Sequence, residues 1–184
     1  MGVRAATNHL IESGATRVHY LGWPSPSGTG DDRRRGWADA MRKHLGSDGA
    51  ALVNLESISV EDVSKATAVV AELLKRQPSI DALVCVSDSL ALGAMIAAAS
   101  AGRPQLPIIG FDNTPIAQAV GFSSVEQSLG LVAAGALELL MGATGSDLVG
   151  RRPSPGEAHR LITPELVIRR PNQLSIREPN STDT

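Results

Sequence analysis

The sequence predicts an α/β protein in which a Rossmann-like parallel sheet is flanked by helices. Four continuous runs of apolar, partly β-branched residues are typical of strands that are buried on both faces. The segments between these runs carry apolar residues at helical spacing, so that strands and helices alternate. The chain has 184 residues, of which 42% are hydrophobic, and this is enough for one core of this kind.

The first half of the chain contains two predicted helix and strand pairs. An amphipathic helix is predicted at residues 2–14, where the pattern "VRAATNHLIESG" ends at a glycine. The strand "RVHYLG" follows at 17–21. A second helix is predicted at 31–45, because acidic residues occupy its first turn and a glycine follows its end. The segment "AALVNL" predicts a strand at 50–55.

The middle of the chain continues the alternation. A helix is predicted at 60–77, with apolar residues at helical spacing, and it is followed by the strand "DALVCV" at 81–86. A further helix at 88–101 is apolar on nearly every side. The strand "LPIIGF" at 106–111 comes next, and a short helix is expected after Pro115.

The pattern changes beyond residue 122. "FSSVEQ" predicts a short strand and "SLGLVAAGALELLMG" a helix, followed by the Gly-, Pro- and Ser-rich loop "TGSDLVGRRPSPGEA". "RLITPELVIRR" predicts two short strands that are interrupted at Pro164. The polar composition of residues 171–184 predicts a disordered tail.

Composition and charge exclude several classes of function. The formal net charge is −2 and no long basic block occurs, so the chain by itself is a poor candidate for nucleic-acid binding. It contains neither a run of roughly 18 apolar residues nor the pattern of a signal peptide. Cys85 is the only cysteine, which excludes an internal disulfide and fits a reducing cytosol. Met1 leads directly into a helix, which we interpret as the start of a truncated chain.

The sequence contains no recognisable catalytic or metal-binding pattern. It lacks a P-loop, a G-x-S-x-G elbow and an H-E-x-x-H motif, and its four histidines show no metal-like spacing. Cys85 lies within an apolar run, where a small buried hydrophobe is a better interpretation than a nucleophile. We therefore expect neither enzymatic activity, nor a cofactor, nor a metal.

Polar residues gather after the predicted strands. The segments that follow the four strands are "GWPSPSGTGDDR", "ESIS", "SD" and "DN". Because parallel strands all end at one edge of a sheet, these segments bring hydroxyls, carboxylates, an indole and an arginine together. Ligands of open α/β sheets bind at that edge, so the sequence predicts a ligand site there.

The same residues also have purely structural interpretations. Ser87 and Asp88 are favourable helix caps, so they either cap the following helix or contact a ligand. Asp112 can also cap a helix, but Asn113 or Thr114 can do so instead, which favours a ligand role for Asp112. In "DDRRR", three arginines oppose the dipole at a helix start, and we expect one of them to bind ligand oxygens.

Taken in order, these segments resemble the effector-binding core of LacI/GalR-type transcription regulators, which share their fold with periplasmic sugar-binding proteins. The resemblance runs over about residues 2–170. It is carried by "GVRAATNHLIESGATRVHYLGW", "RRRGWADAM", "VSDSLALGAM", "IIGFDN", "SSVEQSLGLVAAGALELL" and "LITPELVIRR". It implies a type I periplasmic-binding-protein-like fold, of which this chain is mostly the C-terminal lobe.

The resemblance also implies a division of the chain between two lobes. Residues 16–122 would form the C-terminal lobe, and residues 1–15 and 123–145 would be returning segments of the N-terminal lobe. Residues 146–170 would supply the loop and the terminal strands. The N-terminal helix-turn-helix of the family would lie before Met1, so operator DNA would be bound only by that missing part.

The resemblance assigns ligand contacts to particular residues. Arg33 matches the family's arginine that binds ligand hydroxyls or carboxylates, and Asp112 matches the acid that accepts hydrogen bonds from a sugar. Gln127 lies at the crossing to the other lobe and is expected to reach the cleft. Ser87 stands where many members have a ligand-contacting Asn, and Asp88 is expected mostly to cap its helix.

Two further positions bear on which ligand is bound. Ile58 replaces an aromatic residue that stacks on sugar rings in many members, and Trp23 is a candidate to substitute for it. The serine at position 87 in place of Asn, together with Ile58 in place of a ring, argues against a plain hexopyranose. A sugar, a related polyol or a nucleoside remains as the expected class of effector.

The resemblance predicts a homodimer through the apolar helix at 88–101, although simple burial under the sheet is the alternative. The predicted contact residues are Leu90, Ala91, Ala94, Met95 and Ala98. The function implied is a cytoplasmic, effector-sensing and dimerisation domain of a bacterial repressor. The alternative is a periplasmic sugar-binding protein of a transporter, against which the apolar dimer helix argues.

Overall fold

The computed structural model describes residues 1–46, 55–59, 61–142 and 162–169, and the predicted α/β fold is confirmed. Within these residues six helices alternate with six strands. The helices are α1 (Gly2–Glu12), α2 (Thr29–Leu45), α3 (Val63–Arg76), α4 (Asp88–Ser100), α5 (Pro115–Val120) and α6 (Leu129–Gly142). The strands are β1 (Val18–Gly22), β2 (Glu56–Ile58), β3 (Ala82–Cys85), β4 (Ile108–Phe111), β5 (Ser123–Glu126) and β6 (Glu165–Val167).

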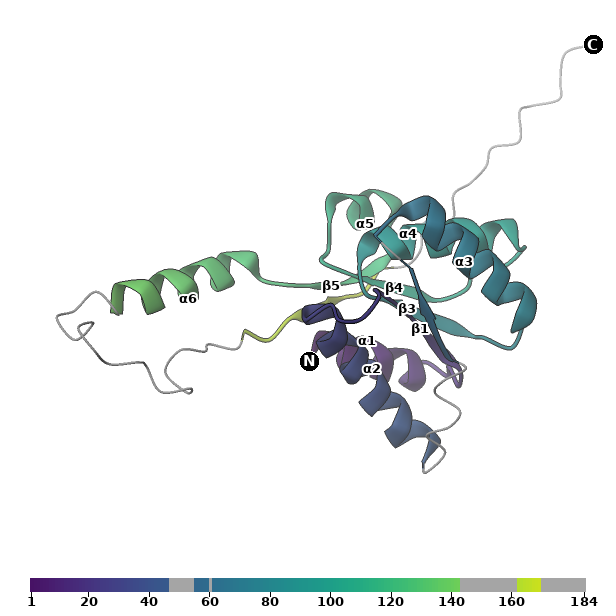
Figure 1. The fold of residues 1–184 in the computed structure, drawn as a ribbon, viewed down its shortest axis with the longest axis horizontal. Coiled ribbons are helices and arrows are strands. Elements are labelled where there is room, and N and C mark those ends of the chain that lie inside the picture. Colours follow the sequence, from purple (N-terminus) through teal and green to yellow (C-terminus); the bar gives the residue numbers. More distant parts are fainter. Residues whose placement is uncertain (47–54, 60, 143–161, 170–184) are drawn as a thin grey trace, which may run out of the picture.

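The strands form one sheet in the order β2-β1-β3-β4-β5-β6. The first five are parallel, and β6 pairs antiparallel with β5. Figure 1 shows α1 and α2 on one face of this sheet and α3, α4 and α5 on the other. The strand order changes direction between β1 and β3, which is the point where open α/β sheets bind ligands.

Most of the predicted elements agree with the structure within a few residues. The strand expected at 50–55 is the main difference: the observed strand is β2 at Glu56–Ile58, and residues 47–54 lie outside the described part. Of the two strands expected near Pro164, β6 is the second, and the first lies mostly outside the described residues. The predicted tail at 171–184 also lies outside them.

Helix α4 packs on one side against the sheet and α3, and this explains much of its apolar composition. The side chains of Leu90, Ala91 and Ala94 are fully buried in this layer. Gly93 lets the two helices approach closely, since a Cβ at this position would lie 2.6 Å from the backbone oxygen of Val63. The α3–α4 contact therefore depends on small residues rather than on large side chains.

The other face of the sheet is covered by α1 and α2. Trp37 of α2 is buried, stacks on Tyr20 with ring centroids 5.5 Å apart, and donates from Nε1 to the oxygen of Val18 at 3.0 Å. Val3 and Leu10 of α1 belong to the same core. Residues 1–15, which were expected to belong to the other lobe, thus place α1 beside α2 on this sheet.

Helix α6 is present as predicted, but it stands apart from the sheet. Figure 1 shows it extending away from β5, with no other described element alongside it. Four of its large apolar side chains are exposed: Leu129, Leu131, Val132 and Leu137. Exposed apolar side chains on a helix usually pack against another surface, and none of the described elements provides that surface for α6.

Candidate ligand-binding site

The polar segments predicted to meet at one edge of the sheet do meet there. Trp23 follows β1, Glu61 follows β2, Ser87 follows β3 and Asp112 follows β4. Arg33 reaches the same edge from the second turn of α2. We call this set of five residues the rim.

Arg33 and Asp112 form the centre of the rim. The two side chains form an ion pair, with Nη2 of Arg33 3.3 Å from Oδ1 of Asp112. Nη1 of Arg33 donates to the backbone oxygen of Val86 at 2.6 Å. The guanidinium carbon lies 3.7 Å from the ring centroid of Phe111 and 5.5 Å from that of Trp23. Arg33 is therefore held between two rings, with its side chain only 12% exposed. A guanidinium fixed in this way loses little conformational entropy when it binds a ligand.

Gln127 joins this centre from the end of β5. Its Nε2 donates to Oδ1 of Asp112 at 2.7 Å. The sequence predicted that Arg33, Asp112 and Gln127 lie together, and the structure brings them together. The other oxygen of Asp112, Oδ2, has no protein partner among the described residues, and the side chain is 35% exposed. A carboxylate oxygen in this state can accept a hydrogen bond from a ligand hydroxyl.

The backbone at Asp112 is unusual. Asp112 and Asn113 have φ values of 98° and 46°, in the left-handed region that non-glycine residues rarely adopt. Such a conformation costs on the order of 1–3 kcal/mol and persists only where the surroundings hold it. Here the amide of Asn113 donates to Oγ of Ser124 at 3.0 Å, and its Nδ2 donates to Oε2 of Glu126 at 3.0 Å.

Asp88 has a different structural role from the predicted one. Ser87 is the N-cap of α4, and its Oγ accepts from the amide of Leu90 at 3.4 Å. Asp88 is buried, and its carboxylate accepts from the amide of Thr114 at 2.7 Å and from Oγ of Ser124 at 2.6 Å. The prediction that Asp88 caps its own helix is therefore wrong. Its carboxylate instead ties α4 to the loop after β4, and burial raises its pKa.

Glu61 is a rim residue that the sequence analysis did not single out. Nε1 of Trp23 donates to its Oε2 at 2.5 Å, and Oγ of Ser87 lies 2.8 and 2.9 Å from its two oxygens. The sequence placed Glu61 in the first turn of a helix, where an acidic residue needs no further explanation. Because the second strand was expected at 50–55 and is observed at Glu56–Ile58, the sequence did not mark Glu61 as a residue near a strand end.

Trp23 lies just after β1, as the sequence predicts, whereas Ile58, which was expected after a strand at 50–55, is the last residue of β2. Ile58 is exposed and offers an apolar surface. Trp23 is partly buried, with one side of its ring near Arg33 and its N–H bonded to Glu61. Trp23 is thus held in place within the rim by its neighbours.

The thiol of Cys85, which lies in this region, is poorly suited to act as a nucleophile. Cys85 is fully buried, and burial, with smaller contributions from Asp88 and Glu61, raises its pKa. A thiol with a raised pKa is a poor nucleophile. The described residues contain no cluster of three metal-ligating side chains. Among them, no helix combines the length and the apolar composition that a membrane crossing requires.

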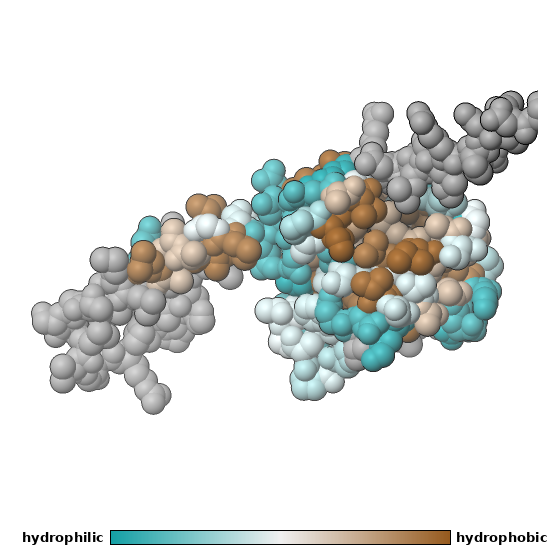
Figure 2. Space-filling view, turned by 90° about the horizontal axis from the view of Figure 1, so that it is seen from above, coloured by the Kyte–Doolittle hydropathy of each residue, from teal (hydrophilic) through white to brown (hydrophobic). Residues whose placement is uncertain are grey.

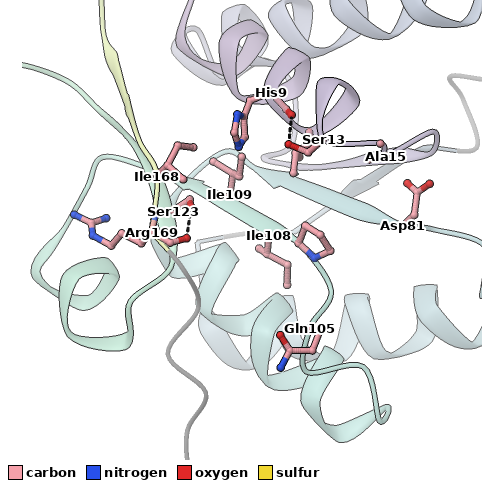
Figure 3. A pocket seen from close by; sticks show the side chains of 13 residues that line it. His9, Ser13, Ala15, Asp81, Gln105, Ile108, Ile109, Ser123, Ile168 and Arg169 are labelled. Carbon is pink, nitrogen blue, oxygen red and sulfur yellow. Dashed lines mark hydrogen bonds between the residues drawn. The ribbon is translucent and has the colours of Figure 1, made fainter.

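A hollow of about 430 Å³ lies at the opposite, amino edge of the sheet, next to the end of α1. In Figure 3, Ser13 bonds to the backbone of His9, and Ser123 bonds to the backbone of Arg169. Asp81, also at this hollow, accepts from the amides of Thr16 and Arg17. These polar groups already have protein partners, so the hollow is a weaker candidate than the rim.

The contact face predicted on α4 requires a correction. Leu90, Ala91, Ala94 and Ala98 are buried inside the chain, so a second molecule cannot touch them, and the prediction for these four is wrong. An all-apolar helix does not reveal which side the sheet covers. Met95 is partly exposed. Ile96 of α4 and Ile116 of α5 are 44% and 45% exposed, and Figure 2 shows apolar surface on the side of the molecule that α3, α4 and α5 cover.

Comparisons with known proteins agree with this geometry. The sequence model of a family described as a periplasmic binding protein-like domain matches residues 7–170. The HTH-type transcriptional regulator GalR of Escherichia coli K12 is 31% identical over 173 residues, which cover 91% of this chain and 48% of that protein. The chain spans about half the length of the curated relatives it matches.

Solved structures give the same result. A regulatory protein of the LacI family from Chloroflexus aggregans has a TM-score of 0.78 and 31% identity, covering 92% of this chain and 59% of that one. The transcriptional regulator CelR in its complex with cellobiose has a TM-score of 0.77 and 26% identity, covering 92% of this chain and 51% of that one.

Proposed function

Because the chain belongs to the periplasmic binding protein-like domain family, we propose that it is the effector-binding part of a LacI-type transcription regulator. The observation that carries this proposal is the Arg33–Asp112–Gln127 group at the carboxyl edge of the sheet. The similarity to regulators along most of the chain supports the same assignment.

The proposed effector is a sugar or a related polyol. Oδ2 of Asp112 can accept from one hydroxyl, and Arg33 uses only two of its five N–H groups in hydrogen bonds to residues that the structure describes. Carboxylate and guanidinium groups side by side can satisfy the alternating donors and acceptors of a polyol. The cellobiose complex of the relative CelR supports this class of ligand.

The second wall of the cleft is proposed to come from an N-terminal lobe. Helix α6, with its exposed apolar side chains, fits a returning segment that packs on that lobe. Gln127, which directly precedes the Ser128–Leu129 start of α6, would then lie at the hinge. Closure of the two lobes on the effector would shift the population between two arrangements of the regulator.

The regulator is proposed to act in the cytoplasm as a homodimer. The outward face of α4 and α5, with Met95, Ile96 and Ile116, is the candidate contact surface, since an isologous pair buries the same patch on both copies. Operator DNA would be bound by a helix-turn-helix elsewhere in the full-length protein. This surface favours a regulator over a monomeric transport receptor.

The test is calorimetric titration of the full-length protein with a panel of mono- and disaccharides. Arg33→Ala should weaken binding of any sugar that binds the wild type by at least about tenfold, because a hydrogen bond to a charged group contributes roughly 1.5–3 kcal/mol. Asp112→Asn, which keeps the shape of the side chain, should weaken it as well. Arg42→Ala, on the exposed side of α2, is the control. Unchanged affinity in both rim variants would contradict the proposed site.

A further inference from the structure

Glu61 is the second carboxylate of the rim, beside Asp112, and it changes which ligands the rim can recognise. Ser87 has one hydroxyl hydrogen, and it donates this hydrogen bond to the carboxylate of Glu61, whose two oxygens lie 2.8 and 2.9 Å from Oγ. The oxygen of Ser87 also faces the amide of Leu90 at 3.4 Å. Ser87 therefore has no donor left for a ligand. The group presented to the cleft at this position is the exposed carboxylate of Glu61.

The charge of Glu61 is not balanced within the described residues. Arg33 is the cation of the rim. Its guanidinium lies over the Trp23 ring, but its ion pair is with Asp112 and not with Glu61. Glu61 takes part in no ion pair with a described lysine, arginine or histidine. Its bonds come from the neutral donors Trp23 and Ser87. The rim thus carries one paired positive charge and two negative charges.

From this arrangement we infer that Glu61 determines specificity and selects effectors that carry an ammonium group over neutral and anionic polyols. The inference rests on the proposed function, because it assigns the effector class of that same site. A carboxylate only accepts hydrogen bonds, so its ligand partner must be a donor. An ammonium offers three donors and compensates the charge, whereas a ligand carboxylate or phosphate meets an unpaired like charge.

The rim contains its own reporter of binding. The chain has two tryptophans, and their indole N–H groups give two separate signals in a ¹⁵N–¹H spectrum. The Trp23 N–H is bonded to Glu61, whereas the Trp37 N–H is bonded to the backbone of Val18 inside the core. Trp37 is therefore an internal control, and the variant Trp23→Phe assigns the two signals. Weak binding at millimolar concentration is measurable in this way.

The experiment titrates the ¹⁵N-labelled 184-residue chain at pH 7 and low salt with three matched sugars. These are 6-amino-6-deoxyglucose, glucose and glucuronate, together with their galacto counterparts. The Trp23 signal should report the tightest binding for the amino sugar and the weakest for the uronate. In Glu61→Gln the preference for the amino sugar over its neutral parent should fall about tenfold, in line with the loss of one charge pair at an exposed site. Glu72→Gln, which makes the same change of charge near the other end of α3, should leave the preference unchanged.

Each of the other outcomes contradicts either the role of Glu61 or the proposed class of effector. If the sugars move the Trp23 signal but the preference is the same in Glu61→Gln, the role of Glu61 is wrong and the effector-binding proposal stands. The role of Glu61 is also wrong if Trp37 moves as strongly as Trp23, because binding is then not local to the rim. If no sugar moves the Trp23 signal in any variant of the chain or in the full-length protein, where both walls of the cleft are present, the sugar-like effector of the proposed function fails, and this inference fails with it.

Discussion

Burial of His19 in β1 makes the stability of the chain depend on pH. The ring is buried, its Nε2 lies 3.0 Å from Oγ of Ser57, and its Nδ1 has no hydrogen-bond partner among the described residues. Burial lowers the pKa of His19 from 6.5 to about 3, with smaller contributions from the positive charges of Arg17 and Arg76. The folded chain therefore keeps this histidine neutral over most of the acidic range.

The sign of the effect follows from proton linkage. The unfolded chain binds a proton at His19 below pH 6.5, and the folded chain does so only near pH 3, so acid favours unfolding. The stability that His19 contributes is present above pH 6.5 and is lost as the pH falls from 6.5 towards 3. With about 1.36 kcal/mol for each pKa unit, the loss between pH 7.5 and 4.5 is about 2.7 kcal/mol.

Urea denaturation of the wild type and of His19→Gln at these two pH values measures the effect. Other carboxylates and histidines titrate in both proteins, so only the difference between their pH dependences reports on His19. That difference should be about 2.7 kcal/mol, while His44→Gln, at an exposed position on α2, should match the wild type. A difference below about 0.5 kcal/mol would refute the argument, because it would mean that His19 titrates normally in the folded chain.

Three further predictions concern packing and association. Gly93→Ala should lower the free energy of unfolding, measured by urea denaturation, by about 1–2 kcal/mol. The added Cβ would lie 2.6 Å from the backbone oxygen of Val63 and 2.7 Å from Cβ of Ala66. A stabilised variant would contradict this close contact. Ile96→Asp should shift the chain from dimer to monomer in analytical ultracentrifugation, because it places a charge on the proposed contact face; an unchanged dimer would exclude that face. Cys85 should react with a thiol reagent only after unfolding, and rapid labelling of the native chain would show that the β3 layer opens.

The fold was predictable because its signals are local. Apolar runs that alternate with helical spacing predict buried parallel strands and covering helices, and four of the five parallel strands were found close to their observed positions. The exception is β2, which is short and half-buried and so lacks the continuous apolar run that marks its neighbours.

The site was predictable in part. Arg33, Asp112 and Gln127 were found because strand ends share an edge and because the resemblance assigns roles to them. Glu61 was missed because its contact with Ser87 joins residues far apart in the sequence, and a helix start explains an acidic residue without it.

Contacts on α4 were the least predictable feature. Leu90 and Ile96 are both apolar residues of the same helix, yet the first is fully buried and the second is 44% exposed. Only the position of the sheet and of α3 decides between them. A helix that is apolar on every side carries no periodic signal from which its covered face can be read.

The measurement that tests the central claim most directly is a crystal structure of the full-length protein with the sugar that binds it most tightly in calorimetry. We predict ligand density at the carboxyl edge of the sheet, with a ligand oxygen within hydrogen-bonding distance of both Arg33 and Oδ2 of Asp112. Ligand density in the hollow at the amino edge, beside Ser13 and Asp81, with the rim unoccupied, would contradict the claim.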